Sequence, residues 1–210
     1  MNTKTPLSFC KIGTVKPLII GLTLTMLMGC KSSYKTTTEL QSVFIEEELK
    51  ELETMRSFFI EDIMQLNDDN FHSKFRSEMR KLEANGFSTV EPKKIENLFN
   101  SMPKETFNEI WKPKTHVPSR PNSVSYEYLV PNESGKYLQF LAKNTKHNSR
   151  IKDYYNKVIK SGNFSHFSML NYLNDDTLDF DLSNTNIQIV LAIHYISICH
   201  DNNITSNALN

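Results

Sequence analysis

From residue 187 to residue 199 the chain reads IQIVLAIHYISIC, and this stretch decides the fold. Its isoleucine and valine content is compatible with a strand, but thirteen residues are long for a strand. The preceding run of residues 183–186, Ser-Asn-Thr-Asn, consists of types that cap helices. We therefore predict a helix, and because it is apolar nearly all round, we expect the other elements to pack against it as a central buried helix.

The chain from Glu39 to about Leu66 shows the spacing of a second long helix. Apolar residues recur there at alternating steps of four and three positions, and Arg56 occupies one position that should be apolar. Glu46, Glu47 and Glu48 fall in the first turns, where carboxylates suit the positive end of the helix dipole, and we expect them on a solvated face. The apolar positions of this series are Ile45, Leu49, Leu52, Phe59, Ile63 and Leu66.

Shorter helices are predicted between these two. Asn67-Asp68-Asp69-Asn70 interrupts the first pattern, and Asn85-Gly86 and Ser161-Gly162 provide helix stops. Ser88-x-x-Glu91 is typical of a capping box, and the helix that follows it is predicted to place Ile95, Leu98 and Phe99 on its apolar side. A helix opened by Pro103 is expected to carry Trp111 and to end before Pro113. The predicted fold class is all-α: an irregular multi-helix bundle with a long N-terminal helix and a buried C-terminal helix.

Residues 126–130 suit a short extended piece, but nothing nearby clearly pairs with them.

The pattern divides the chain into six segments. The expected segments are a leader at 1–29, a polar tether at 30–38, a helical part at 39–112, a Pro-rich loop at 113–125, a helical part of the same domain at 126–202, and a tail at 203–210.

The N-terminus has the three parts of an export signal. Lys4, Lys11 and Lys16 give a basic start without acidic residues, an apolar run covers residues 18–28, and small Gly29 precedes Cys30. The run is shorter than the roughly 20 apolar residues that a membrane-spanning helix needs. A buried N-terminal helix with a core cysteine is the alternative, but it explains poorly the polar residues that follow at once.

The sequence Leu27-Met28-Gly29-Cys30 resembles the lipobox of bacterial lipoprotein precursors. The resemblance covers only the first thirty residues. It implies cleavage before Cys30, acyl chains such as palmitate on that cysteine, and attachment to a membrane of the bacterial cell envelope, on the periplasmic side or at the cell surface. It implies nothing about the fold that follows.

Charge and cysteine content limit the partners and the chemistry. Removal of residues 1–29 takes away three lysines and no acid, which leaves 21 basic and 24 acidic residues and a net charge of −3. A mildly acidic chain argues against a nucleic-acid partner, which requires a basic stripe. Because Cys10 leaves with the leader and Cys30 carries lipid, Cys199 remains alone and no intrachain disulfide can form.

Two clusters contain residue types found in reactive or metal-binding sites. Asp175, Asp179 and Asp181 alternate like calcium ligands, but Phe180 and Asn186 stand where a calcium loop needs Gly and Glu, so we expect a capping loop and no metal. His194, Cys199 and His200 lie close in sequence, but on a helix the two histidines point roughly 120° apart. A buried thiol is the better interpretation, since free cysteine behaves as a small apolar residue. No cofactor is expected.

Trp111, Tyr126 and Tyr128 flank the predicted Pro-rich loop and are of types enriched in binding surfaces, although core packing explains such residues equally well. No motif predicts catalysis. We therefore expect a non-catalytic binding or structural module with a protein or envelope partner. The alternatives are an envelope hydrolase with a dispersed active site and a periplasmic inhibitor or immunity-type protein.

Overall fold

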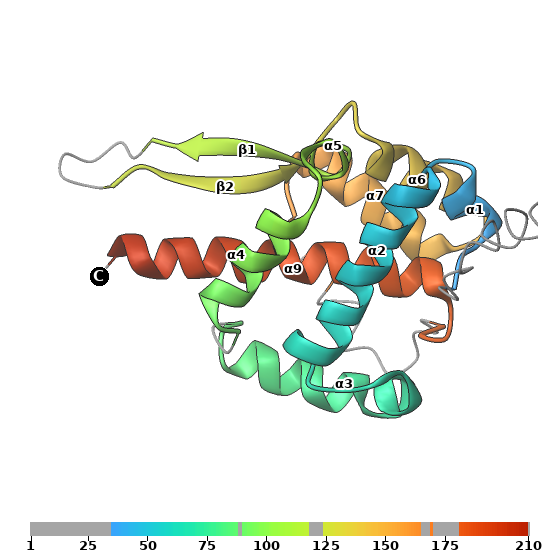
Figure 1. The fold of residues 1–210 in the computed structure, drawn as a ribbon, viewed down its shortest axis with the longest axis horizontal. Coiled ribbons are helices and arrows are strands. Elements are labelled where there is room, and N and C mark those ends of the chain that lie inside the picture. Colours follow the sequence, from blue (N-terminus) through green and yellow to red (C-terminus); the bar gives the residue numbers. More distant parts are fainter. Residues whose placement is uncertain (1–34, 88–89, 118–123, 165–168, 170–180, 210) are drawn as a thin grey trace, which may run out of the picture. The chain divides into compact units, whose positions relative to one another are not determined.

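The structure is a computed structural model, and it describes residues 35–87, 90–117, 124–164, 169 and 181–209. These residues belong to one compact unit that starts at Tyr34. Figure 1 shows its helices arranged around one long helix, α9 (Thr185–Leu209). The other elements described are α1 (Thr38–Gln41), α2 (Glu46–Phe58), the π-helix η1 (Phe59–Ile63), α3 (Asp68–Ala84), α4 (Pro92–Ser101), α5 (Lys104–Asn108), β1 (Trp111–His116), β2 (Tyr126–Pro131), α6 (Lys136–Asn144) and α7 (Ser149–Ser161).

Helix α9 confirms the predicted central helix. Residues 186–199 are all buried, including the polar side chains of His194 and Ser197. Helices α2 and α4 and strand β2 contact it, so no side of this segment faces water. Tyr195 illustrates the packing, because its ring is stacked between Phe59 and Phe87 with 5.7 Å between centroids on each side. Helix α9 also continues to Leu209, where residues 203–210 were expected to form a tail.

The helix predicted from Glu39 to about Leu66 is divided into α1, α2 and η1. The break after α1 buries Phe44, whose ring contacts Phe140 of α6 with 6.0 Å between centroids. The expectation for Glu48 was wrong, since it is buried rather than on a solvated face. Its carboxylate accepts hydrogen bonds from the Ile45 amide at 2.9 Å and from Lys136 Nζ at 2.6 Å, so it both caps α2 and joins it to α6.

The helix boundaries follow the predicted capping residues in several places. The Asn67 side chain accepts a hydrogen bond from the Asn70 amide at 3.1 Å and begins α3. Gly86 and Gly162 follow the ends of α3 and α7 with φ values of 64° and 65°, which glycine adopts without steric cost. The predicted capping box that starts at Ser88 lies outside the described residues, and α4 begins with Pro92 in its first turn.

The fold is predominantly helical, as predicted, but it is not purely all-α. Strands β1 and β2 form a two-stranded antiparallel sheet in which Trp111 pairs with Pro131 and His116 with Tyr126. Residues 113–116 of the predicted Pro-rich loop therefore lie in β1, while residues 118–123 lie outside the described part. Pro113 is tolerated because each strand of a two-stranded sheet has one unpaired edge where no amide donor is needed.

Candidate functional site

Helix α9 has two ends with different surroundings. Near its start, Thr37 Oγ1 donates a hydrogen bond to Asn186 Oδ1 at 2.6 Å, which ties the first described residues to the N-terminal end of α9. Fifteen positions later, Asp201 Oδ1 accepts a hydrogen bond from the Leu129 amide of β2 at 3.0 Å. At about 1.5 Å per residue, these two attachments lie about 22 Å apart along the helix.

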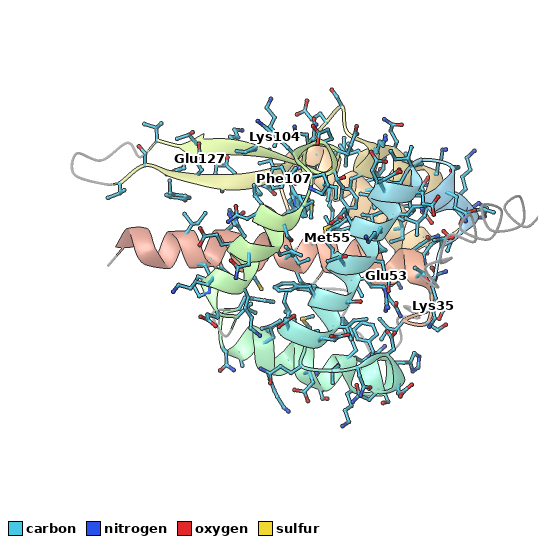
Figure 2. All side chains as sticks on the ribbon, in the orientation of Figure 1. Lys35, Glu53, Met55, Lys104, Phe107 and Glu127 are labelled. Atoms are coloured by element: carbon cyan, nitrogen blue, oxygen red, sulfur yellow. The ribbon has the colours of Figure 1, made fainter. Side chains whose placement is uncertain are left out.

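The β-hairpin of β1 and β2 points away from the first of these attachments. Its base is fixed where the buried Trp111 Nε1 donates a hydrogen bond to Ser197 Oγ at 2.7 Å. Leu129, two residue pairs nearer the tip, bonds to Asp201, so the strands run along α9 toward its C-terminus. Figure 2 shows the same arrangement, with Lys35 and Glu127 at opposite ends of the described unit.

One face of this hairpin carries tyrosines and cations, and we call it the hairpin face. Because side chains alternate between the two faces of a strand, the residues that pair in register at Lys112, Lys114 and His116 share a face, opposite to that of Trp111 and Leu129. The His116 and Tyr126 rings are 4.9 Å apart across the strands, and Tyr128 is half-buried beside them. The hairpin face consists of Lys112, Lys114, His116, Tyr126, Tyr128 and, at its base, the buried Val130.

Trp111, a candidate binding residue, is not part of this surface. Its side chain is 1% exposed and packs against Phe99 and Phe107 at centroid distances of 5.1 and 5.3 Å. Trp111 is therefore a core residue that fixes the base of the hairpin. The structure brings Tyr126 and Tyr128 together on the hairpin face but places Trp111 beneath it.

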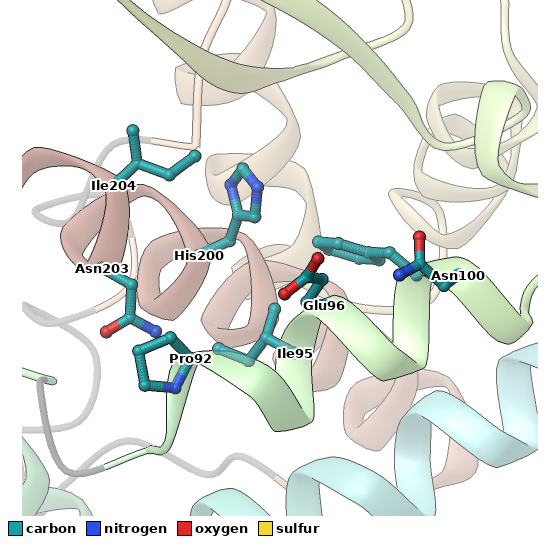
Figure 3. A pocket seen from close by; sticks show the side chains of 8 residues that line it. Pro92, Ile95, Glu96, Asn100, His200, Asn203 and Ile204 are labelled. Atoms are coloured by element: carbon teal, nitrogen blue, oxygen red, sulfur yellow. The ribbon is translucent and has the colours of Figure 1, made fainter. Parts of the chain in front are cut away.

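A pocket opens between α4 and the last described part of α9, near the same end as the hairpin. It has a volume of about 370 Å³, and Figure 3 shows side chains from the two helices on its opposite sides. The residues that line it are Pro92, Ile95, Glu96, Phe99, Asn100, His200, Asn203 and Ile204. Of these, Ile95 and Phe99 belong to the apolar stripe predicted from the sequence, whereas the polar members were not identified.

Two polar groups of the pocket have distinctive surroundings. The Nδ1 atom of His200 lies 3.0 Å from Asp201 Oδ1, and the imidazole ring contacts the Phe99 ring at a centroid distance of 5.3 Å. The Asp201 carboxylate favours the His200 tautomer with its hydrogen on Nδ1, and in that tautomer Nε2 is a hydrogen-bond acceptor. The Nδ2 atom of Asn203 is buried and has no hydrogen-bond partner among the described residues.

The three residues His194, Cys199 and His200 do not form one site. His194 is fully buried, with Nδ1 3.1 Å from the Tyr154 hydroxyl, whereas His200 lines the pocket. Cys199 is buried, which confirms the prediction, and burial raises the pKa of its thiol to about 12. A thiol with so high a pKa is not a nucleophile at neutral pH.

The aspartates weighed as calcium ligands are only partly described. Asp175 and Asp179 lie outside the described residues. Asp181 Oδ1 accepts a hydrogen bond from the Ser183 amide at 3.0 Å and so forms a turn just before α9. Within the part of the chain that the structure describes, no three His, Cys, Asp or Glu side chains are close enough together to hold a metal ion.

The predicted lipidation residue, Cys30, also lies outside the described residues. Among those that are described, no helix combines the length and the apolar character needed to cross a bilayer. No protein-family model matches the chain, and no curated protein or solved structure matches it.

Proposed function

We propose that this chain is a membrane-anchored bacterial lipoprotein that acts as a non-catalytic binding module in the cell envelope. The N-terminal signal and Cys30 support the anchor. The observation that carries the binding role is the attachment of the two ends of α9. The chain that leads back to Cys30 meets α9 at Asn186, whereas the hairpin begins near Ser197 and points away.

In this proposal the tether decides which surface a partner can reach. Seven polar residues, 31–37, separate Cys30 from the start of α1 at Thr38 and span at most roughly 23–25 Å when extended. The N-terminal end of α9 then lies close to the bilayer, and the hairpin is directed away from it. An anchored protein can use such a distal surface to bind a partner without interference from the membrane.

The side chains of the hairpin face suit a protein partner with an acidic surface. Tyrosine provides large contact area at little cost in side-chain entropy, and it is enriched among the residues that dominate binding energies. Lys112 and Lys114 are exposed on β1 and pair in register with Val130 and Tyr128. Complementary acidic groups on the partner would speed association and fix its orientation.

Site-specific photocrosslinking in intact cells tests this binding role. A photoreactive amino acid at Tyr128 should give a discrete adduct with one protein. The same amino acid at Lys74, an exposed position on α3, should not give that adduct. The double charge reversal Lys112→Glu and Lys114→Glu should remove the Tyr128 adduct. Identical adducts from both positions, or an adduct unaffected by charge reversal, would contradict the proposal.

One observation favours the second candidate, an envelope hydrolase. Asp201 orients His200 in the pocket in the way that a carboxylate orients a catalytic histidine. The eight lining residues include no serine, threonine or cysteine, so this histidine would have to activate water rather than a side-chain nucleophile. Envelope material hydrolysed by the wild-type chain but not by His200→Ala would support the hydrolase instead of the binding module.

A further inference from the structure

We propose that the pocket between α4 and α9 binds a basic side chain of the protein partner, and that arginine fits it best. This inference deepens the proposed function and rests on it. The pocket and the hairpin both adjoin the C-terminal half of α9, so one partner can contact both.

The walls suit the aliphatic part of a long basic side chain. Pro92, Ile95, Phe99 and Ile204 contribute apolar surface from both helices. The volume of about 370 Å³ lies at the lower end of the range of about 300–1,000 Å³ typical of ligand pockets. A single long side chain therefore matches the space better than an extended ligand does. Arginine and lysine bury their methylene groups on such surfaces while the charged group stays near water.

The polar groups at the pocket are predominantly hydrogen-bond acceptors. Glu96 brings a carboxylate that forms no ion pair with any described residue, and Asn100 follows one helical turn later. On α9, His200 offers Nε2 as an acceptor in the tautomer favoured by Asp201. The eight lining residues include no lysine or arginine. The Glu96 carboxylate is therefore not balanced by a lysine or an arginine in the lining, and it attracts a cation.

Asn203 adds a buried polar atom that a ligand can satisfy. A buried polar group without a partner destabilises the protein, and the Nδ2 atom of Asn203 is such a group. Because the two ends of an amide exchange by a half rotation, the side chain can present its oxygen to a cationic donor instead. Binding a donor there would remove the cost.

Arginine is preferred over lysine because the acceptors are spread over two helices. Glu96 and Asn100 lie on α4, and His200 and Asn203 lie on α9 (Figure 3). The guanidinium group presents five N–H donors in a planar fork and can reach both sides at once. The ammonium group of lysine is a compact charge that would satisfy one side only.

Titration of the purified full chain in detergent with N-acetyl-arginine amide tests the inference by calorimetry. We expect saturable binding with a dissociation constant of about 1 mM, an affinity typical of a single side chain. N-acetyl-citrulline amide has nearly the same shape without the charge and should bind at least about fivefold more weakly, as expected for the loss of about 1 kcal/mol. N-acetyl-leucine amide should bind more weakly still.

The matched variants are Glu96→Gln and Glu105→Gln. Each removes one carboxylate from an exposed residue, but only Glu96 lines the pocket, since Glu105 lies on α5. Glu96→Gln should weaken arginine binding at least about fivefold, and Glu105→Gln should leave it unchanged. Unfolding followed by Trp111 fluorescence shows that both variants fold.

Absence of saturable binding, equal binding of the citrulline or leucine compound, or equal affinity of the two variants would overturn the inference. This assay involves neither the membrane nor the partner. If arginine does not bind in this assay but the Tyr128 adduct forms and depends on Lys112 and Lys114, the arginine pocket is rejected and the binding module stands. If the Tyr128 position gave no discrete adduct in the otherwise wild-type chain, the proposed function itself would be rejected.

Discussion

At the scale of single residues, Arg56 shows why a charged side chain can stand in an apolar series. The residue is 4% exposed, and its guanidinium donates hydrogen bonds to Glu53, Asp68 and Gln188 at 2.6, 2.6 and 3.0 Å. The sequence identified Arg56 as an exception in the pattern. Its partner Gln188 lies 132 positions away, so the reason for the exception depends on the tertiary fold and could not be predicted.

Replacing Arg56 with Met should lower the free energy of unfolding by about 2–3 kcal/mol. The buried Gln188 oxygen loses its donor, whereas Glu53 and Asp68 are partly exposed and regain water, which keeps the cost below that of a fully buried pair. Urea unfolding measures the change. Lys81→Met, which breaks the exposed Lys81–Glu78 pair, should change stability by less than about 0.5 kcal/mol. Equal effects of the two substitutions would refute this role of Arg56.

The ion pair also predicts a dependence on pH. The hydrogen bond from Arg56 lowers the pKa of Asp68, so the folded state holds this carboxylate ionised more strongly than the unfolded state does. The contribution of the ionised Asp68 to the free energy of unfolding is therefore fully present above the unfolded-state pKa of about 3.9. It is lost as the pH falls through the lower pKa of the folded state. Wild type should exceed Asp68→Asn in unfolding free energy at neutral pH, and the difference should shrink below about pH 4. A difference in unfolding free energy between wild type and Asp68→Asn that stayed constant down to pH 2 would contradict this role of the Arg56–Asp68 pair.

Cys199 gives a chemical test of burial. Because burial raises the pKa of its thiol to about 12, a thiol reagent at pH 8 should modify the folded protein far more slowly than the urea-unfolded protein. In the proposed mature protein Cys199 is the one free thiol, since Cys10 leaves with the leader and Cys30 carries lipid. Equally rapid modification in both states would show that the thiol is accessible.

At the scale of elements, helix α9 was predictable and the hairpin was not. The apolar run from Ile187 to Cys199 is too long for a strand and has no polar face, which together indicate a buried helix. Strand β1, by contrast, contains Pro113 and alternates weakly, so its sequence does not indicate a strand even though its partner β2 is the next element along the chain. The extended piece at residues 126–130 was recognised, but its partner strand was not.

The contact between these elements can be tested through Trp111, the single tryptophan of the chain. Ser197→Ala leaves the buried indole N–H without its acceptor and should destabilise the protein by about 1–2 kcal/mol. Unfolding followed by tryptophan fluorescence measures this directly. Ser101→Ala, at an exposed position on α4, is the control and should have a much smaller effect. Unchanged stability of Ser197→Ala would mean that the hydrogen bond does not hold β1 on α9.

The pocket between α4 and α9 could be predicted only in part. Ile95 and Phe99 were predicted on the apolar side of α4, and Glu96 and Asn100 follow each of them by one position at a spacing of one helical turn. This spacing was a signal that two polar side chains border the apolar stripe. That they face His200 and Asn203 is a property of helix packing, which no local pattern contains.

At the scale of the whole molecule, the proposal assigns a different task to each end of α9. The sequence predicts the anchor from the first thirty residues, and the structure adds the separation of about 22 Å between the two attachments on α9. Neither observation alone implies that the hairpin points away from a membrane. The orientation follows only when Cys30 carries lipid and the tether is short.

Lipid attachment at Cys30 is therefore the central claim, and metabolic labelling with a fatty acid followed by membrane fractionation tests it most directly. The account predicts that the wild-type chain begins at Cys30, carries label and sediments with membranes. The variant Cys30→Ala should be unlabelled and should not remain bound to membranes through lipid. A wild-type protein that still begins at Met1, or one that carries no fatty-acid label, would contradict it.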